Sequence, residues 1–366
     1  MKPSSKQLFI RQTTLPEIGE AGQQKLQNAS VLVVGCGGLG SPIAVYLAAS
    51  GIGKIHLVDF DTVSFSNLHR QVFYTLEDVG KPKAEVLASF LKERAPFTEV
   101  SFSNQPISKD NIFELIASID IVVDGTDALP IKYLLNDACV LKGKPLVYGS
   151  LYKYDGYVAT FNIKQKDGTY STNLRDIFPE MATDVPNCEE AGTLNSIVGM
   201  IATQQVNEVL KVVTGIGSQL TNQLLIYNSL ENTQLKMKIT SLVSKENIES
   251  IFLKHSYIDT ACEYQNEALQ ISPAALKKLI ESSLNGVETE HNLEIIAVLP
   301  NLELPFQVHQ TIPIQDFAVE KIKIDFNKTH VMVCQLGFNS YKATEMLKKR
   351  YPKLVVYSLT GGISSY

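Results

Sequence analysis

Short apolar runs alternate with amphipathic stretches from residue 31 to about residue 159. A short apolar run bounded by turn residues is typical of a buried strand. Strands are predicted at Val31–Val34, Ile55–Val58, Glu99–Asn104, Ile119–Asp124 and Pro145–Gly149. Helices are predicted between them, including Ser41–Ala49, Lys83–Arg94 and Leu129–Lys142. This alternation predicts an α/β fold, a doubly wound and mostly parallel Rossmann-like sheet with helices on both faces.

A second, smaller α/β pattern follows later in the chain. Before it, later strands of the first pattern are predicted at Gly156–Phe161 and Leu224–Ile239, flanking a helix from about Leu194 to Val213. The segment Ser241–Ala268 is polar and mixed, and it is interpreted as containing a linker. Beyond it lie predicted helices at Ser272–Ser283 and Tyr341–Arg350, and predicted strands at Leu293–Leu299, His330–Cys334 and Leu354–Tyr357. The predicted domains are therefore residues 1–245 and 269–366, joined by a linker at 246–268.

Composition narrows the class of protein. The chain has 366 residues, 45% hydrophobic and 19% charged, with a net charge of −5, so a large core is possible and no basic surface for nucleic acid or membrane is indicated. Its five cysteines are scattered and form no C-x-x-C pair, which favours a reducing, cytoplasmic setting without disulfides. The first residues lack the apolar run of a signal peptide. The most apolar segment is broken by glycines and Pro42, so no membrane span is predicted.

A glycine-rich loop joins the first predicted strand to the first helix. Gly35, Gly37 and Gly40 have G-x-G-x-x-G spacing, with an additional Gly38. Glycines there allow a tight turn and a close approach of backbone to phosphate, and the helix N-terminus favours an anion. Asp59 ends the next strand at the distance expected of an acid that binds ribose hydroxyls. The pattern predicts a nucleotide site, with a ligand-free structural turn as the simpler alternative.

The residues that follow Asp59 favour ATP over a nicotinamide cofactor. Arg70 and Lys83 can bind phosphate oxygens and offset the charge of a leaving pyrophosphate. Asn67 can orient a phosphate or ribose oxygen, and Asp127 can hold Mg²⁺. Each of these side chains alone is ordinary protein surface, but together with the glycine loop they predict an enzyme that splits ATP.

The chain resembles the MoeB/ThiF adenylyltransferases, relatives of the ubiquitin-activating enzymes. The resemblance covers roughly residues 7–240. It rests on the stretches RQTTLPEIGEAGQQKL, VLVVGCGGLGSPIAVYLAASGIG, DFDTVSFSNLHRQVF, DVGKPKAE, DGTDALPIKYLLNDAC and CEEAGTLNSIVGMIATQQVNEVLK. The glycine pattern alone would be a weak signal, but the whole set is specific.

The resemblance implies a reaction and its partners. Such enzymes use Mg-ATP to join AMP to the C-terminal Gly-Gly carboxylate of a ubiquitin-like sulfur carrier, and a persulfide donor such as a cysteine desulfurase then supplies sulfur for a thiocarboxylate. Carried over by position, Gly38 lines the nucleotide, Asp59 binds the ribose, and Asn67, Arg70 and Lys83 bind the phosphates. Asp127 serves Mg²⁺ and adenylation. Arg11 matches an arginine that reaches the partner's ATP site, which implies a homodimer.

The cysteines of this chain match those of some family members and not of others. Cys188 matches a cysteine that some members use in sulfur transfer, and an idle loop cysteine is the alternative. Many members hold a structural zinc with two C-x-x-C pairs, which closes a tetrahedral site. Asn173 and Asp176 stand at the first pair here, and no second pair follows residue 240, so no zinc is predicted. How the loop around Arg175 is held is then an open question.

The C-terminal stretch THVMVCQLGFNSYKATEMLKKRYPKLVVYSLTGGISSY resembles rhodanese domains, which carry sulfur as a cysteine persulfide. Cys334 follows a strand and faces a helix N-terminus, which favours the thiolate. Asn339 stands where rhodaneses usually have an arginine, and an acid near Ala297 and an arginine near Leu299 are absent. Binding of small anionic sulfur donors is therefore not expected, whereas a protein persulfide donor fits. Both a sulfur relay through Cys334 and an inert docking domain are open.

We therefore predict a sulfur-carrier adenylyltransferase with a fused rhodanese-like domain. In the relay hypothesis, a persulfide on Cys334 attacks the acyl-adenylate, and Cys188 then releases the thiocarboxylate. Molybdopterin biosynthesis is the favoured pathway, and thiamine thiazole biosynthesis is the alternative with the same chemistry. An NAD-dependent oxidoreductase and a non-catalytic scaffold are the other candidates.

Overall fold

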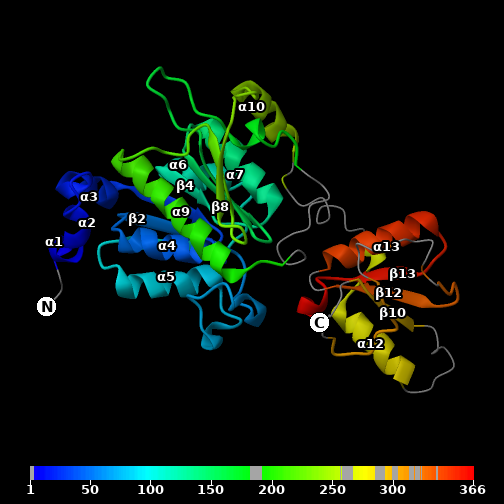
Figure 1. Ribbon diagram of the computed structural model, residues 1–366. Helices are drawn as coiled ribbons and strands as arrows, with labels where there is room; N and C mark the ends of the chain where they lie inside the picture. The colour runs from blue at the N-terminus through cyan, green and yellow to red at the C-terminus, as the bar shows by residue number, and fades with distance from the viewer. Residues whose placement is uncertain are drawn as a thin grey trace. The chain divides into compact units, whose positions relative to one another are not determined.

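The chain divides into two compact units, Met1–Tyr257 and Ile258–Tyr366 (Figure 1). The computed structural model describes residues 4–181, 192–255, 257, 267–284, 293–298, 304–312, 317, 322, 324–334 and 337–366. No helix within these ranges is long and apolar enough to cross a membrane.

The first unit contains an eight-stranded sheet in the order β3-β2-β1-β4-β5-β6-β7-β8. Its strands are β1 Ser30–Val34, β2 Lys54–Val58, β3 Glu99–Ser103, β4 Ile121–Asp124, β5 Leu146–Tyr152, β6 Asp155–Phe161, β7 Gln223–Asn228 and β8 Thr233–Lys238. Pairing is parallel from β3 through β5 and antiparallel from β5 through β8. The predicted doubly wound, mostly parallel sheet is confirmed.

Helices cover both faces of this sheet (Figure 1). They are α1 Ser5–Leu8, α2 Ile10–Thr13, α3 Gly19–Asn28, α4 Gly40–Ala49, α5 Lys83–Arg94, α6 Ile112–Ala117, α7 Leu129–Lys142, α9 Asn195–Thr214 and α10 Lys245–Lys254. One apolar core contains residues of α3, α4, α5 and α9, and another contains residues of α6, α7 and α10. Because both faces are covered, every residue of β1 is buried, which explains its continuous apolar run.

Two predictions in the first unit differ from the structure. The segment Leu224–Ile239 forms the hairpin β7–β8, because Asn228 accepts hydrogen bonds from the N–H groups of Leu230 and Glu231 and Asn232 has a φ of +50°. Part of the predicted linker is the helix α10. Ser244 caps its N-terminus, and Ile248 and Phe252, one turn apart, are buried, with Phe252 in the core that contains α7.

The strand order reverses at β1. Strands β2 and β3 lie on one side of β1, and β4 and β5 lie on the other. In an open α/β sheet, the carboxyl ends of the strands at such a switch point leave a crevice where ligands bind. The crevice here lies beyond Val34 and Asp124, the last residues of β1 and β4.

The second unit contains a five-stranded parallel sheet in the order β11-β10-β12-β13-β9. Its strands are β9 Gln270–Ile271, β10 Leu293–Ala297, β11 Gln310–Thr311, β12 Thr329–Val333 and β13 Val356–Leu359, and its longer helices are α12 Pro273–Leu284 and α13 Phe338–Arg350. One core lies on the α13 face of the sheet and another on the α12 face. The predicted smaller α/β domain is therefore present, with its last strand starting two residues later than predicted.

Candidate active site

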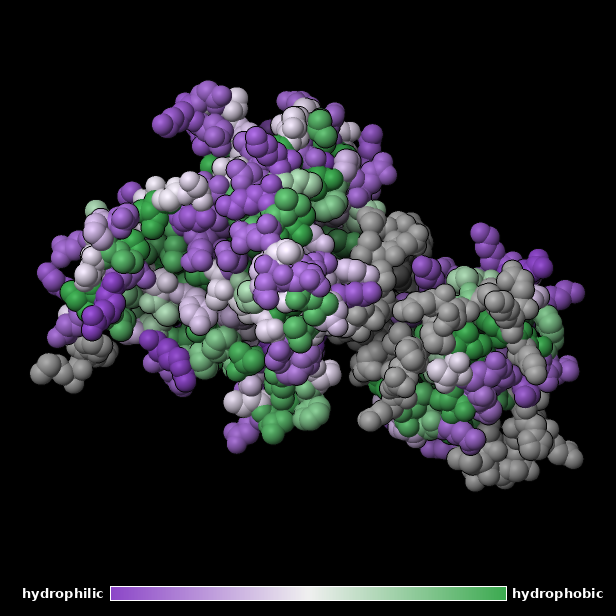
Figure 2. Space-filling model, in the orientation of Figure 1, coloured by the Kyte–Doolittle hydropathy of each residue, from purple (hydrophilic) through white to green (hydrophobic). Residues whose placement is uncertain are grey.

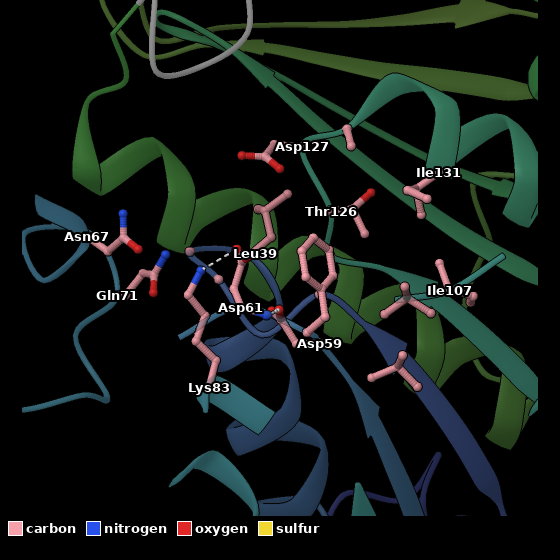
Figure 3. Close-up of a pocket in the computed structure, with 18 of the residues that line it drawn as sticks. Leu39, Asp59, Asp61, Asn67, Gln71, Lys83, Ile107, Thr126, Asp127 and Ile131 are labelled. Atoms are coloured by element: carbon pink, nitrogen blue, oxygen red, sulfur yellow. Dashed lines mark hydrogen bonds and ion pairs between the residues drawn. The ribbon is translucent and has the colours of Figure 1, made fainter. Parts of the chain in front are cut away.

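A pocket of about 270 Å³ lies at the carboxyl ends of β1, β2 and β4, as the switch point predicts (Figure 3). Its lining includes most of the residues that sequence analysis assigned to the nucleotide: Gly35, Gly37, Gly38, Asp59, Asn67, Arg70, Lys83 and Asp127. Apolar side chains, among them Leu39, Ile107 and Ile131, also line the wall. The pocket therefore combines an apolar part with a part rich in charged and amide groups.

The glycine loop is closed against the end of β4. Gly35 has a φ of +85°, and a Cβ there would lie 2.8 Å from the carbonyl oxygen of Gly125. A Cβ on Gly40 would lie 1.7 Å from the carbonyl oxygen of Gly35, so no side chain fits. At Gly38, a Cβ would lie 2.8 Å from Val198 and 3.6 Å from Cγ of Arg70. The glycines thus permit both the turn and the close packing of Val198 against it.

Asp59 is held rigidly beside the glycine loop. One carboxylate oxygen accepts the N–H of Cys36 at 2.6 Å, and the other accepts the N–H of Asp61 at 2.8 Å. Burial raises the pKa of Asp59, and this effect exceeds the opposing influence of the Lys83 charge and the two N–H donors. The carboxylate remains in the pocket wall, where ribose hydroxyls can donate to it.

Cationic and amide side chains gather beside the glycine loop. The Lys83 side chain is only 7% exposed, and its Nζ lies 2.9 Å from Oδ2 of Asp61. Figure 3 shows Lys83 near Gln71, with Asn67 beyond it. Arg70 enters the same pocket, with its Nη1 2.9 Å from Nε2 of His69. A buried ammonium and a guanidinium facing one cavity are suited to bind phosphate oxygens.

Asp127 is the acid with the freest carboxylate in the pocket. It is exposed, and within the described residues its side chain makes no hydrogen bond or ion pair. Figure 3 shows the carboxylate on the turn between β4 and α7. The described residues contain no cluster of three or more His, Cys, Asp or Glu side chains arranged for a metal. A Mg²⁺ ion that arrives with a nucleotide needs only one or two carboxylates, so Asp127 fits that role.

Gln71 is a pocket residue that the sequence analysis did not single out. It is 4% exposed, lines the pocket beside Lys83, and its buried Oε1 has no hydrogen-bond partner among the described residues. Its backbone N–H donates to the carbonyl of Asn67, so one helical turn places both amides on the same side. That spacing from Asn67 was the only available signal.

One residue that sequence analysis assigned to the nucleotide lies away from this pocket. Arg11 is exposed on α2 and does not line the pocket of its own chain. Cys188 lies outside the described residues. Of the other cysteines, Cys36 and Cys139 are fully buried, and burial raises the pKa of each thiol, as expected of packing residues.

The positions matched to zinc-binding cysteines carry hydrogen bonds instead. Asn173 and Asp176 form a reciprocal cap on the short helix Leu174–Asp176, and Asp176 also accepts the N–H groups of Leu242 and Val243. These bonds join the two chain segments that a closed zinc site would bridge. The absence of zinc itself remains a prediction.

A buried ion pair holds the adjacent arginine. Nε and Nη2 of Arg175 donate to the carboxylate of Asp137 on α7, the latter at 2.7 Å, and Tyr257 donates its hydroxyl to the same carboxylate. Arg175 also donates to the carbonyl of Pro179 at 2.9 Å. These contacts answer how the loop around Arg175 is held.

Cys334 occupies a closed loop in the second unit. It follows β12, is 2% exposed, and its Sγ accepts the N–H groups of Gly337 at 3.1 Å and Ser340 at 3.3 Å. Gly337 has a φ of +91° and directly precedes α13, so the helix N-terminus faces the sulfur. Ala297, where an acid was sought, is buried in an apolar core, and Leu299 lies outside the described residues.

The strand order, the glycine loop and the cationic side chains of Lys83 and Arg70 in one pocket define a nucleotide-binding α/β protein. The ThiF family matches residues 9–248. A sulfur carrier protein adenylyltransferase from Thermus thermophilus is 42% identical over 63% of this chain and 86% of its own length. A probable adenylyltransferase/sulfurtransferase, MoeZ, from Mycobacterium tuberculosis is 33% identical over 98% of this chain and 92% of its own length. The chain therefore belongs to the ThiF family, and it is an adenylyltransferase enzyme of the MoeB/ThiF type.

Two further similarities concern the fold and the chain as a whole. A probable molybdopterin-synthase adenylyltransferase from Porphyra purpurea is 32% identical over 98% of this chain and 92% of its own length. The crystal structure of E. coli MccB with MccA-N7isoASN matches with a TM-score of 0.56 and 24% identity, over 64% of this chain and 72% of that chain. The structural match supports the fold alone.

Proposed function

We propose that this enzyme uses Mg-ATP to adenylate the C-terminal Gly-Gly carboxylate of a ubiquitin-like sulfur-carrier protein, and that it then converts the acyl-adenylate to a thiocarboxylate. The observation that carries the proposal is the convergence of Lys83, Arg70, Asn67 and a free Asp127 on one glycine-lined pocket. The names of the relatives from Thermus thermophilus and Mycobacterium tuberculosis support the carrier and the sulfur step.

The charges in the pocket match the difficulty of adenylation. A carboxylate that attacks the α-phosphorus of ATP is repelled by the phosphate charge, and negative charge then develops on the leaving pyrophosphate. Lys83, Arg70 and the glycine-loop N–H groups can neutralise that charge; a reduction of the barrier by about 4 kcal/mol gives roughly a thousandfold in rate. Asp127 would hold Mg²⁺, and the ion would supply further positive charge against the phosphates.

The sulfur step is proposed to begin at Cys334. A persulfide donor such as a cysteine desulfurase transfers sulfane sulfur to this thiolate. The terminal sulfur of the Cys334 persulfide attacks the acyl carbon of the adenylate, and AMP leaves with the electron pair of the broken C–O bond. The product is an acyl disulfide. Cys188 then attacks Sγ of Cys334, which releases the thiocarboxylate and leaves a Cys188–Cys334 disulfide for a cellular thiol to reduce.

A homodimer is proposed from two features near the pocket. Arg11 is exposed outside the pocket of its own chain, so a partner's pocket is the place where it could contact ATP. Apolar side chains are exposed along the segment between β2 and α5, next to the pocket, at Phe60, Phe65, Val72, Leu76 and Val79. Figure 2 shows hydrophobic residues gathered there at the lower edge of the first unit. A second copy that covers this patch would bury it.

The pathway is proposed to be molybdopterin biosynthesis, in the cytoplasm. The full-length relative from Porphyra purpurea is named for that pathway. Thiamine thiazole biosynthesis is the second candidate, because its carrier is activated by the same chemistry. An NAD-dependent oxidoreductase is not retained, because the ThiF family match identifies an adenylyltransferase and the pocket presents cations to a triphosphate.

The test is carrier-dependent ATP–pyrophosphate exchange with purified carriers of each pathway. We expect exchange with one carrier and, when a cysteine desulfurase and cysteine are added, a gain of the mass that replaces oxygen by sulfur at the carrier's C-terminus. Absence of exchange with every Gly-Gly carrier would contradict adenylation. Exchange with a thiamine-pathway carrier alone would move the pathway to the second candidate.

A further inference from the structure

Lys132 is a buried cation beneath the pocket that none of the roles above uses. It lies on α7, and its side chain is 2% exposed. Its Nζ donates to Oδ2 of Asp124 at 3.0 Å and to the carbonyl oxygens of Thr126 and Gly149, each at 2.7 Å. An ammonium has three donors, so all of its hydrogen-bonding capacity is used.

The three acceptors belong to two walls of the pocket. Thr126 lies in the turn between β4 and α7, and the consecutive residues 125–128 of that turn line the pocket. Gly149 lies on β5, and the next two residues, Ser150 and Leu151, also line the pocket. One ammonium therefore ties the turn to the neighbouring strand.

Asp124 completes the arrangement. Its Oδ2 contacts Lys132, and its Oδ1 accepts both the N–H of Thr126 at 3.0 Å and the hydroxyl of Thr126 at 2.8 Å. The carboxylate is fully buried, with an exposed fraction of 0%. Its two oxygens thus hold the turn and the cation together.

Asp127 depends on this arrangement for its position. Its side chain has no hydrogen-bond or ion-pair partner among the described residues. The position of the carboxylate therefore follows from the backbone of the turn. Two hydrogen bonds at Thr126 fix that backbone: its N–H donates to Asp124, and its carbonyl oxygen accepts from Lys132. Small errors in the position of a catalytic group have large effects on rate.

We propose that Lys132 is a positioning residue for adenylation: with Asp124 it fixes the β4–α7 turn so that Asp127 faces the phosphates of bound Mg-ATP. This inference rests on the proposed function. It predicts that loss of the Lys132–Asp124 pair lowers the rate of the chemical step much more than it weakens ATP binding. A pair that only stabilised the fold would leave the rate of the folded enzyme unchanged.

The experiment compares two ion pairs. The test variant, Lys132→Met with Asp124→Asn, removes both charges and leaves no unpaired ion. The control, Glu208→Gln with Lys211→Met, removes a pair whose side chains are 2% and 24% exposed and which does not line the pocket. We expect kcat for carrier-dependent exchange to fall by about ten- to a hundredfold in the test variant, with KM for ATP changed less than about threefold, and no comparable fall in the control.

A smaller change keeps the test decisive if the double variant does not fold. Thr126→Val preserves the Lys132–Asp124 pair and removes only the hydroxyl bond to Asp124. We expect its kcat to fall in the same direction by a few-fold, with KM for ATP unchanged. A kcat equal to that of the natural enzyme in the folded test variants would overturn the inference.

Hydrogen–deuterium exchange provides a measurement independent of activity. Without ligand, the amides of residues 125–128 should exchange faster in Lys132→Met with Asp124→Asn, or in Thr126→Val, than in the natural enzyme and the Glu208/Lys211 control. Unchanged exchange would overturn the positioning role. If the natural enzyme adenylates no carrier, the proposed function fails, and the amide exchange still decides whether Lys132 holds the turn.

Discussion

The two units use the same local arrangement for different purposes. In each, a buried parallel strand runs into a loop with a glycine at positive φ and then into a helix: Gly35 at +85° before α4, and Gly337 at +91° before α13. In the first unit, the N–H groups of Gly37 and Gly38 have no acceptor among the described residues and border an open pocket. In the second, the N–H of Gly337 is already bound by the sulfur of Cys334.

The difference indicates what each loop can hold. An open loop flanked by Lys83 and Arg70 is prepared for an anion that arrives from solution. At Cys334, by contrast, the N–H groups of Gly337 and Ser340 already donate to a sulfur atom that the chain itself carries. The first arrangement is suited to binding a nucleotide and the second to carrying a persulfide.

The largest expected effect comes from removing the Cys334 thiol, which should affect sulfur transfer and leave adenylation intact. Cys334→Ser should abolish thiocarboxylate formation, while carrier-dependent ATP–pyrophosphate exchange stays within about twofold of the natural enzyme, because no pocket residue is altered. Cys139→Ala, which removes a buried thiol from the first unit, serves as the control and should retain both activities. Intact sulfur transfer in Cys334→Ser would mean that the second unit carries no sulfur.

Loss of a pocket cation should have the next largest effect. Lys83→Met should lower kcat/KM for exchange by about a hundred- to a thousandfold, because a buried donor to developing phosphate charge is removed. Lys81→Met is the matched control: its side chain is 56% exposed, is paired with Asp78, and does not line the pocket. Equal rates in the two variants would show that the pocket charge does not act on ATP.

The raised pKa of Asp59 gives the nucleotide pocket a pH dependence. Because burial raises this pKa, protonation begins at a higher pH than for an ordinary aspartate, and ATP affinity should fall up to tenfold per pH unit below the pKa. Protonation of Asp59 does not itself destabilise the folded state. The folded state binds this proton more tightly than the unfolded state, so the contribution of Asp59 to stability is present at low pH and is lost as pH rises through the raised pKa.

The measurement is the ATP dissociation constant as a function of pH, by calorimetry, for the natural enzyme and Asp59→Asn. The variant should bind ATP more weakly near neutral pH and should not show the acid limb that Asp59 causes. An identical acid limb in both proteins would assign the pH dependence to another group.

The smallest expected effect concerns the hydrogen-bond donors around Cys334. Ser340→Ala removes the hydroxyl that lies 3.3 Å from Sγ of Cys334 and keeps the two backbone donors. The rate of alkylation of Cys334 by iodoacetamide should fall by about two- to tenfold, since a single hydrogen bond contributes about 0.5–1.5 kcal/mol. Thr344→Val, a buried change on the same helix that leaves the sulfur donors intact, should not alter the rate.

Local patterns predicted the elements and the residues close in sequence to the glycine loop. Buried strands such as β1 and β4 are continuous apolar runs, and Asp59 and Lys83 lie at element ends, where the chain returns to one edge of the sheet. The contacts of Lys132 were not predictable in the same way. One of its acceptors, the carbonyl of Gly149, is a backbone atom 17 residues away, and backbone atoms leave no signature in side-chain patterns.

Longer-range pairing explains the other differences. The Arg175–Asp137 pair joins residues 38 positions apart, and neither residue is distinctive by itself. The helix α10 was assigned to a linker because its surroundings are polar, although the apolar Ile248 and Phe252 have helical spacing. Arg11 and Cys188 stay predictions, because the first requires a partner chain and the second lies outside the described residues.

The hydrogen bond from the Tyr257 hydroxyl to Asp137 also limits how short a stable fragment of the first unit can be. A fragment that ends at Tyr257 keeps α10 on the core with α7 and keeps the phenol bonded to Asp137. A fragment that ends before residue 245 would uncover apolar surface and deprive a buried carboxylate of one donor, a cost of about 1–3 kcal/mol for the donor alone. The first unit prepared without the second should therefore extend through this tyrosine.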